Sequence, residues 1–314
     1  MEKKIIKKET SGRGRLPGKQ AKKLPVKQVK KLPVKQAKKL PAVNGAKDLE
    51  KIECFLFDMD GTLYLGNDRL DGAKELIDLL RAQGKKVLYI TNNSSRVPSQ
   101  YVEKLAKMDI SATVDDFFTS ADAIVYLLNK TSPGAKIYVV GTPGFENFMA
   151  DRGFKLVRGY ETDPDKRPEF VVLGFDTTLT YEKLRIMCDY LVDGVRYVAT
   201  HPDMVCPAEG HRFIPDAGSM MLMIEGATGR KPELIAGKPN ATMINILCEK
   251  LGVSKDRTAV VGDRLNTDIM SGINAGSKTI CVLSGETSLE MLKKSDVRPD
   301  YVFDSVLDIY RALR

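Results

Sequence analysis

Short apolar runs that alternate with amphipathic segments constrain the fold of this chain more than any other feature. The runs predict buried strands, at Cys54–Phe57, Val87–Ile90, Ile137–Val140, Phe170–Leu173, Tyr197–Ala199, Ala259–Val261 and Thr279–Leu283. The segments between them predict helices, at Ala73–Gln83, Ser99–Met108, Ala121–Leu128, Tyr181–Leu191, Ala241–Leu251 and Ser288–Lys293. Such alternation is typical of a mostly parallel sheet with helices on both faces. We therefore predict an α/β fold.

The composition limits the class of protein. A chain of 314 residues is long enough for about two domains, and its 43% hydrophobic content can form a substantial core. No run approaches the ~18 consecutive apolar residues of a membrane span, and the N-terminus lacks the apolar centre of a signal peptide. The five cysteines are scattered without CxxC spacing, which argues against a disulfide framework or a zinc site. We predict a cytoplasmic protein without a transmembrane segment.

The first 47 residues differ from the rest in charge and composition. They hold 16 of the 49 basic but only two of the 41 acidic residues, a net charge of +14, which leaves −6 for the remainder. An eight-residue repeat runs through them as AKKLPVKQ, VKKLPVKQ and AKKLPAVN. A proline in each unit prevents a continuous helix, and the apolar residues are too few for a core. We predict a disordered tail over residues 1–47.

Two aspartates, Asp58 and Asp60, follow the strand predicted at Cys54–Phe57 within the sequence DMDGT. In open parallel sheets, ligands bind beyond the carboxyl ends of the strands. Two carboxylates this close repel each other and need a cation, and Mg²⁺ prefers oxygen ligands. The pair suits a carboxylate nucleophile beside a carboxyl general acid/base. The alternative is an Asp-Gly turn that merely closes a strand.

Polar residues also follow two other predicted elements. Thr91, Asn92 and Asn93 come directly after the strand Val87–Ile90, where hydroxyl, amide and backbone N–H groups can bind phosphate oxygens. Alternatively, they form a helix cap. Lys238 lies between a glycine and a proline before a predicted helix. It can neutralise a phosphate and neighbouring carboxylates, or it is an ordinary surface lysine.

A second acidic pair, Asp263 and Asp268, follows the strand Ala259–Val261 within VVGDRLNTDI. It would complete an oxygen-rich shell for Mg²⁺. The four motifs thus occur in the order DxDGT, TNN, GKP and GDxxxxD. With these motifs, the sequence from about residue 52 to 312 resembles the haloacid dehalogenase (HAD) superfamily. The long insertion between TNN and GKP is similar to that of the NagD / 4-nitrophenylphosphatase subfamily, subclass IIA.

The resemblance implies a role for each motif residue. Asp58 would be the nucleophile that forms an aspartyl-phosphate, Asp60 would protonate the leaving group and then activate water, and Lys238 would screen the charge between phosphate and nucleophile. The residues implied to hold Mg²⁺ are Asp58, Asp60 through its carbonyl, Asp263 and, nearby or in the outer shell, Asp268. Those implied to contact the phosphoryl group are Gly61, Thr91, Asn92 and Asn93.

The resemblance also implies a domain plan. A Rossmann-like HAD core would comprise residues 48–132 plus 231–314, and an α/β cap of the C2 type would comprise residues 133–230. Only about 30 residues separate Asp58 from Thr91, too few for a cap at that point. Mutases of the superfamily mostly carry their cap there, and dehalogenases typically lack the carboxylate of Asp60. The pattern therefore favours a phosphatase.

The cap contains the segment Thr200–Ser219, which is rich in proline and glycine and follows a predicted strand. We predict a long loop, and such loops are often functional. In NagD-like enzymes the matching loop faces the core and contacts the leaving group, which implies substrate contacts for His201 and Asp203. Glu209 and His211 lie in the same segment. The alternative is an exposed loop whose histidines face solvent.

Two classes of function remain at this point. The first is a Mg²⁺-dependent phosphomonoester hydrolase for a small metabolite, of the sugar phosphate, phosphoglycolate, nucleotide or pyridoxal phosphate class. The second is a polyanion-binding protein whose tail docks on RNA or an anionic membrane. The tail has no interleaved aromatic residue for base stacking, so we expect its contacts to be weak. Association between copies of the chain is expected to use the cap.

Overall fold

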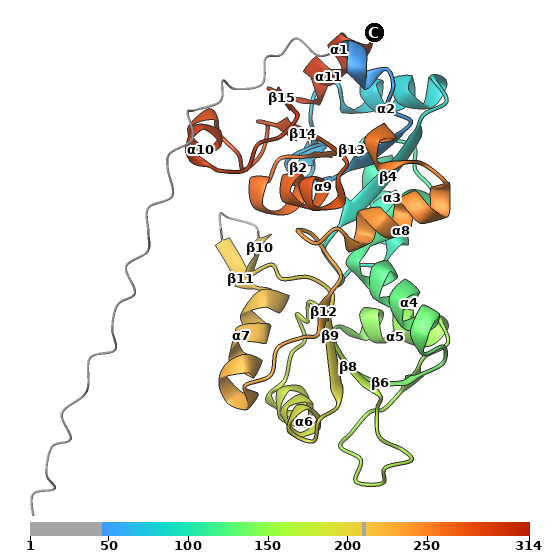
Figure 1. The fold of residues 1–314 in the computed structure, drawn as a ribbon, viewed down its shortest axis with the longest axis vertical. Coiled ribbons are helices and arrows are strands. Elements are labelled where there is room, and N and C mark those ends of the chain that lie inside the picture. Colours follow the sequence, from blue (N-terminus) through green and yellow to red (C-terminus); the bar gives the residue numbers. More distant parts are fainter. Residues whose placement is uncertain (1–45, 209–211) are drawn as a thin grey trace, which may run out of the picture. The chain divides into compact units, whose positions relative to one another are not determined.

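The computed structural model describes residues 46–208 and 212–314, which are drawn in colour in Figure 1. Residues 1–45 of the predicted tail lie outside the described residues, and so do Glu209 and His211 of the cap. The described chain begins with the short helix α1 (Ala46–Leu49), whose Leu49 is fully buried. The fold therefore begins within the last residues that we assigned to the tail.

A six-stranded parallel sheet contains the strand that precedes the first aspartate pair. Its strand order is β15-β14-β13-β1-β4-β5. The bounds are β1 (Cys54–Phe57), β4 (Lys86–Thr91), β5 (Phe117–Thr119), β13 (Thr258–Gly262), β14 (Lys278–Val282) and β15 (Tyr301–Phe303). Strand β1 pairs with β4 on one side and with β13 on the other. Because these strands run parallel, the residues that follow them meet at one edge of the sheet.

Helices cover both faces of this sheet because successive strand residues point to opposite faces. In β1, Leu56 packs with residues of α4 and α8, whereas Phe55 and Phe57 pack with residues of α2 and α11. Each fully buried Phe stabilises the fold by roughly 1.5–3 kcal/mol. The helices are α2 (Ala73–Ala82), α3 (Pro98–Ala106), α4 (Ser120–Thr131), α8 (Thr242–Leu251), α9 (Met270–Ala275), α10 (Leu289–Lys294) and α11 (Val306–Leu313). The predicted α/β fold is confirmed.

A second parallel sheet has the strand order β12-β9-β8-β6-β7. Its strands are β6 (Lys136–Val140), β7 (Lys155–Leu156), β8 (Phe170–Leu173), β9 (Arg196–Ala199) and β12 (Leu234–Ile235), and its helices are α5 (Pro143–Asp151), α6 (Tyr181–Val192) and α7 (Ala217–Thr228). Strand β12 lies beyond residue 230 and yet pairs with β9. The sheet of the predicted cap therefore continues past that limit, and the exact division at residues 132/133 and 230/231 stays a prediction.

The segment Thr200–Ser219 is not the long loop that we predicted. It contains an antiparallel hairpin of β10 (Val205–Ala208) and β11 (Arg212–Pro215), and helix α7 begins at its end. Pro207 and Pro215 made the segment resemble a loop because proline lacks a backbone N–H. In a two-stranded sheet both strands are edges, so such a residue is tolerated wherever its nitrogen faces away from the partner strand.

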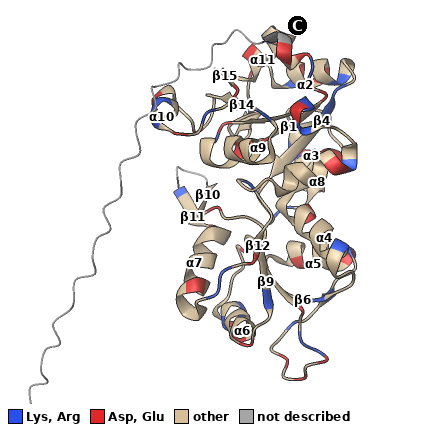
Figure 2. Ribbon diagram, in the orientation of Figure 1, with Lys and Arg blue, Asp and Glu red and all other residues tan. Residues whose placement is uncertain are grey.

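Smaller elements complete the described chain. They are the hairpin of β2 (Tyr64–Leu65) and β3 (Asp68–Arg69), the 3₁₀ turns Val114–Asp116 and Lys255–Arg257, and a π-helical turn over Leu265–Ile269. Acidic and basic residues are interspersed along the ribbon (Figure 2). In the ranges 46–208 and 212–314, no helix has the length and apolar character needed to cross a membrane.

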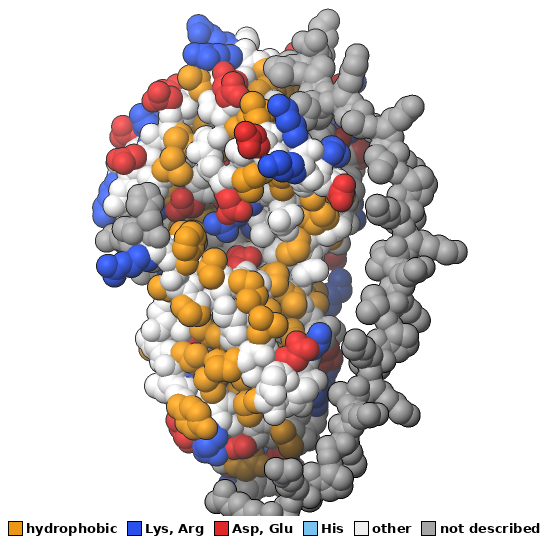
Figure 3. Space-filling view, turned by 90° about the vertical axis from the view of Figure 1, so that its left-hand side faces the viewer, with side chains coloured by type: hydrophobic (Ala, Val, Ile, Leu, Met, Phe, Trp, Pro, Cys, Tyr) orange, Lys and Arg blue, Asp and Glu red, His pale blue; other side chains and the backbone are white. Residues whose placement is uncertain are grey.

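Large apolar side chains are exposed on helix α7 and on the hairpin before it. Phe213, Leu222 and Met223 are 67%, 58% and 48% exposed. Apolar side chains gather on the face of the molecule shown in Figure 3. Exposed apolar surface of this kind often takes part in association. The association of copies through the cap nevertheless stays a prediction.

Candidate active site

Three aspartates meet at the edge of the first sheet where β1 and β13 end. Asp58 follows β1, Asp263 follows β13, and Asp268 lies in the π-helical turn that leads into α9. Carboxylate oxygens of the three residues lie within 4.8 Å of one another. Asp263 and Asp268 are almost completely buried, at 2% and 1% exposure. The structure thus brings the two acidic motifs together.

Glycines make this close approach possible. Gly61 has a φ of 81°, a left-handed conformation that side-chain-bearing residues rarely adopt. A Cβ atom on Gly61 or on Gly285 would collide with the carboxylate of Asp263. Glycine at these two positions therefore lets the turn after β1 and the segment after β14 (Lys278–Val282) lie directly against Asp263.

Lys238 connects the acidic residues. Its Nζ donates hydrogen bonds to Asp58 Oδ1 at 2.5 Å and to Asp268 Oδ1 at 2.6 Å. The residue is only 3% exposed, so it is not the surface lysine that the sequence left as an alternative. With all groups ionised, three carboxylates and one ammonium carry a net charge of −2, which a single divalent cation would balance.

The protonation of these groups reflects their burial. Burial raises the pKa of Asp58, and the charges of Asp268 and Asp263 add to this, whereas Lys238 lowers it. Burial also raises the pKa of Asp263, again with a contribution from Asp268. Burial alone would lower the pKa of Lys238, but Asp268 and Asp58 hold it above its ordinary range. The positive charge nearby therefore does not offset the burial and mutual repulsion of these carboxylates.

The hydrogen bonds indicate where a cation fits. Asp268 has both oxygens engaged, Oδ1 by Lys238 and Oδ2 by the backbone N–H of Arg264 at 3.1 Å. Asp263 Oδ2 accepts from the backbone N–H of Glu286 at 2.7 Å. Its buried Oδ1 has no hydrogen-bond partner among the residues that the structure describes. A buried carboxylate oxygen without a donor, in an all-oxygen set, fits Mg²⁺.

Asp60 lies outside this cluster. Its side chain is exposed, and its carboxylate is not among the three that lie within 4.8 Å of one another. Its backbone forms an isolated bridge with Tyr64, and the N–H of Gly61 donates to the carbonyl of Tyr64 at 2.8 Å. Lys104 Nζ lies 3.9 Å above the ring of Tyr64. Asp60 thus lies two positions after Asp58 as an exposed residue between buried neighbours.

The polar residues after β4 form a turn that is tied to Lys238. Asn92 Oδ1 accepts from the backbone N–H of Lys238 at 2.8 Å, and its Nδ2 donates to the Lys238 carbonyl at 2.9 Å. Thr91 Oγ1 accepts from the N–H of Asn93, whose Oδ1 accepts from Ser95. The side chain of Asn92 therefore fixes the backbone of Lys238. Contact of these residues with a phosphoryl group stays a prediction.

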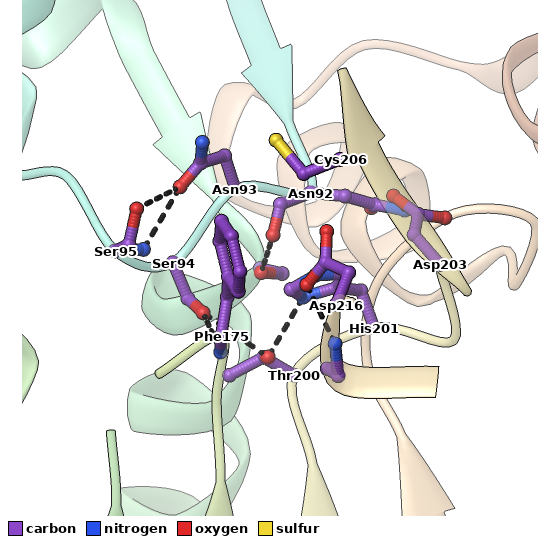
Figure 4. Close-up of polar contacts among 12 residues, drawn as sticks. Asn92, Asn93, Ser94, Ser95, Phe175, Thr200, His201, Asp203, Cys206 and Asp216 are labelled. Atoms are coloured by element: carbon purple, nitrogen blue, oxygen red, sulfur yellow. Dashed lines mark hydrogen bonds and ion pairs between the residues drawn. The ribbon is translucent and has the colours of Figure 1, made fainter. Parts of the chain in front are cut away.

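Residues of the predicted cap reach the same turn, as Figure 4 shows. The carboxylate of Asp203 accepts from Asn92 Nδ2 at 3.1 and 3.2 Å. His201, by contrast, is fully buried, with Nδ1 2.8 Å from Thr200 Oγ1 and Nε2 2.9 Å from Asp216 Oδ1. His201 is thus not solvent-facing, and its ring contacts protein on both nitrogens.

Sequence reasoning missed three residues of this region: Ser94, Thr200 and Asp216. All three are buried and hydrogen-bonded near the turn after β4. Asp216 also accepts from the backbone N–H of Ala217 and caps helix α7. An aspartate directly before a run of helix-forming residues is a helix-start signal that the sequence offered. For Ser94 and Thr200, hydroxyl residues at strand ends gave no distinguishing pattern.

Two family models match the chain. A model described as haloacid dehalogenase-like hydrolase matches residues 55–155, and a HAD-hydrolase-like model matches residues 235–309. An acid sugar phosphatase of Staphylococcus aureus (strain MRSA252) is 38% identical over 255 residues, which are 81% of this chain and 95% of the relative. The matches include every motif that we identified and leave most of the basic tail outside.

Solved structures of similar proteins support the same family. A 4-nitrophenylphosphatase from Thermotoga maritima is 43% identical, with a TM-score of 0.80 over 85% of this chain and 99% of that one. A glycerol phosphate phosphatase from Mycobacterium tuberculosis, crystallised in complex with magnesium, is 30% identical, with a TM-score of 0.76 over 83% of this chain and 77% of that one. The chain belongs to the haloacid dehalogenase-like hydrolases, in the group of phosphatases that contains NagD and the 4-nitrophenylphosphatases.

Proposed function

We propose that this protein is a Mg²⁺-dependent phosphomonoesterase that acts through an aspartyl-phosphate on a small phosphorylated metabolite. One observation carries the proposal. At the end of β1, Asp58 accepts a hydrogen bond from the buried Lys238, beside a carboxylate oxygen of Asp263 that has no partner in the described chain. This set provides a nucleophile, a fixed cation and a place for a metal ion in one location.

Each residue then has a chemical task. An oxygen of Asp58 attacks phosphorus, which forms the Asp58–phosphoryl bond and breaks the bond to the leaving oxygen. Asp60 gives that oxygen a proton and later takes one from the water that hydrolyses the intermediate. Lys238 offsets the negative charge where nucleophile and phosphoryl group meet. When bound, Mg²⁺ supplies further charge neutralisation between the carboxylates and the phosphoryl oxygens.

The remaining site residues have binding roles in this proposal. Gly61, Thr91, Asn92 and Asn93 would surround the phosphoryl oxygens, and Asp203 would face the leaving group. Asp58 and Asp263, with the carbonyl of Asp60, would hold Mg²⁺. Asp268 would be an outer residue, because Lys238 and the N–H of Arg264 already occupy its two oxygens.

The substrate belongs, in our proposal, to the small phosphomonoesters: sugar phosphates, phosphoglycolate, nucleotides or pyridoxal phosphate. Two relatives support the sugar and polyol phosphates within that group, since they are named for sugar phosphate and glycerol phosphate. The five cysteines are all free, which supports a reducing compartment such as the cytoplasm.

Removal of metal should stop the reaction. We expect phosphate release from a panel of phosphomonoesters to fall to background in EDTA, because the carboxylates around Asp58 then lack a balancing cation. Excess Mg²⁺ added to the same sample should restore it. Phosphate release, measured together with the metal content of the sample, checks this. Undiminished turnover with negligible metal would reject a metal-dependent mechanism.

The basic tail offers the second candidate function, contact with polyanions, which is favoured by its net charge of +14. We expect deletion of residues 1–44 to leave kcat and Tm nearly unchanged, with a shift in Tm below about 2 °C, which corresponds to less than ~1 kcal/mol. Binding of a labelled oligouridylate should be weak, sensitive to salt and lost on deletion. A large fall in Tm would show instead that the tail stabilises the body.

A further inference from the structure

A continuous row of buried hydrogen bonds connects the turn after β4 with the start of helix α7. Ser94 Oγ accepts from the backbone N–H of Phe175 at 2.9 Å and lies 3.3 Å from Thr200 Oγ1. Thr200 Oγ1 lies 2.8 Å from His201 Nδ1, and His201 Nε2 lies 2.9 Å from Asp216 Oδ1. Figure 4 shows these side chains in sequence. None of the four residues that form the row is more than 4% exposed.

The donors and acceptors of the row can all be assigned in one direction, from Phe175 to Asp216. Because the Phe175 N–H donates to Ser94, the hydroxyl of Ser94 can donate to Thr200, and the hydroxyl of Thr200 can donate to His201 Nδ1. His201 then donates from Nε2 to Asp216, which also accepts from the N–H of Ala217. The row thus assigns the imidazole tautomer with hydrogen on Nε2.

The far end of the row lies next to the residue that faces the active site. Asp203 follows His201 by two positions, and its backbone carbonyl accepts from the N–H of Gly218 at 2.8 Å. Asp203 is therefore connected to helix α7 in two ways. Through the chain it follows His201, whose ring is hydrogen-bonded to Asp216 at the start of α7, and its own carbonyl accepts from the first turn of α7. From there its carboxylate reaches Asn92, which holds the backbone of Lys238.

Two other roles for His201 fit the structure less well. Ligand atoms of His201, Asp203 and Asp216 lie within 4.8 Å of one another, a spacing that would suit a metal ion. Each of the three side chains, however, already has a hydrogen-bond partner in the protein. Direct substrate contact would require the ring to be accessible, and its exposure is 0%.

We propose that His201 is a positioning residue that acts through Asp203: the row Ser94–Thr200–His201–Asp216 holds Asp203 where it meets the leaving group of the substrate. This inference rests on the proposed phosphatase function. It replaces the direct contact that the sequence suggested for His201. It also makes the hydroxyl of Thr200 a requirement for substrate selection, although Thr200 itself contacts no substrate.

The test compares two changes of one buried residue, one that removes its hydroxyl and one that keeps it. Thr200→Val removes the hydroxyl and breaks the row, whereas Thr200→Ser keeps it. In Thr200→Val we expect kcat/KM for the best sugar phosphate of the panel to fall ~10- to 100-fold, mainly through KM, because a displaced polar group loses much of its effect. For 4-nitrophenyl phosphate, which offers Asp203 no hydroxyl, the change should stay within about threefold. Thr200→Ser should stay close to the wild type for both.

A double-mutant cycle separates positioning from a general loss of structure. If Thr200 acts through Asp203, adding Thr200→Val to Asp203→Ala should cause less than about a twofold further loss, since coupled residues are not additive. The control is Tyr197→Phe in β9, the strand that ends directly before Thr200. It removes a buried hydroxyl that has no partner among the described residues. It should leave both substrates unaffected.

Three results would overturn the inference in an active enzyme: equal losses for both substrates, equal behaviour of the Val and Ser variants, or losses that multiply in the Asp203→Ala background. Wild-type protein that hydrolyses no phosphomonoester in the presence of Mg²⁺ would overturn the proposed function instead, so the two failures are distinguishable.

Discussion

Replacing Asp58 with asparagine is expected to reduce kcat by about a thousandfold or more while the protein stays folded, because loss of a nucleophile typically costs several orders of magnitude. Asparagine has nearly the same shape and keeps an oxygen that can accept the hydrogen bond from Lys238. It lacks the charge and basicity needed to attack phosphorus. The free energy of unfolding should therefore change little, whereas the rate of the chemical step should fall almost to zero.

Single-turnover assays with 4-nitrophenyl phosphate measure this effect, since product release does not limit the first turnover. The matched control is Asp256→Asn, which makes the same chemical change at an exposed position in the turn Lys255–Arg257. It should behave as the wild type. A variant Asp58→Asn that retained activity within tenfold of the wild type would exclude covalent catalysis by Asp58.

The second large effect is expected for Lys238→Met, which keeps an unbranched side chain of similar length but removes its charge. The half-buried Asp58 and the buried Asp268 would then lack their common partner. We expect kcat/KM to fall about 100-fold or more, as for other fixed groups that stabilise transition-state charge. In EDTA at pH 7, the free energy of unfolding should fall by about 3–5 kcal/mol, because removal of one partner leaves buried charges uncompensated.

The sign of the pH dependence follows from the direction of the pKa shifts. Burial raises the pKa of Asp263 to about 6, from an ordinary value of 3.8, and raises that of Asp58 as well. A carboxyl whose folded-state pKa is raised binds its proton more tightly in the folded state, so stability increases as pH falls toward the unfolded-state value. Lys238 lowers the pKa of both carboxyls, so its loss in Lys238→Met raises them further, and the variant gains more stability on acidification than the wild type. The difference in unfolding free energy between the two proteins should therefore shrink between pH 7 and pH 5. Urea unfolding in EDTA at both pH values measures this, and a difference that grew on acidification would contradict it.

The sequence was sufficient for the elements that carry the catalytic motifs. The strand Phe170–Leu173 has the predicted bounds, and β1 does too, because short apolar runs with polar ends define buried parallel strands sharply. The family was also predicted correctly, since four motifs in a fixed order are specific. Helix α7 was missed, because it is apolar on nearly all sides and lacks the periodicity that indicates a helix.

The sequence could not predict which side chains become hydrogen-bond partners in the folded protein. The motif TNN suggested a phosphate contact for Asn92, which stays a prediction, but it did not show that the Asn92 side chain also holds the backbone of Lys238, 146 positions away along the chain. His201 suggested a substrate contact, but it is enclosed between Thr200 and Asp216. Such partners come from elements that meet only in the fold, and no local pattern records which of them will touch.

In the proposed mechanism, Asp58 carries the phosphoryl group during turnover. The most direct test of this step uses Asp60→Asn with 4-nitrophenyl phosphate, whose leaving group needs no proton, so that phosphoryl transfer proceeds while hydrolysis of the intermediate is slow. After acid quench and borohydride reduction, peptide mass spectrometry should find homoserine in place of Asp58, and Asp58→Asn combined with Asp60→Asn should give no modified peptide. Release of 4-nitrophenol with an unmodified Asp58, or with the phosphoryl group on another residue, would contradict the account.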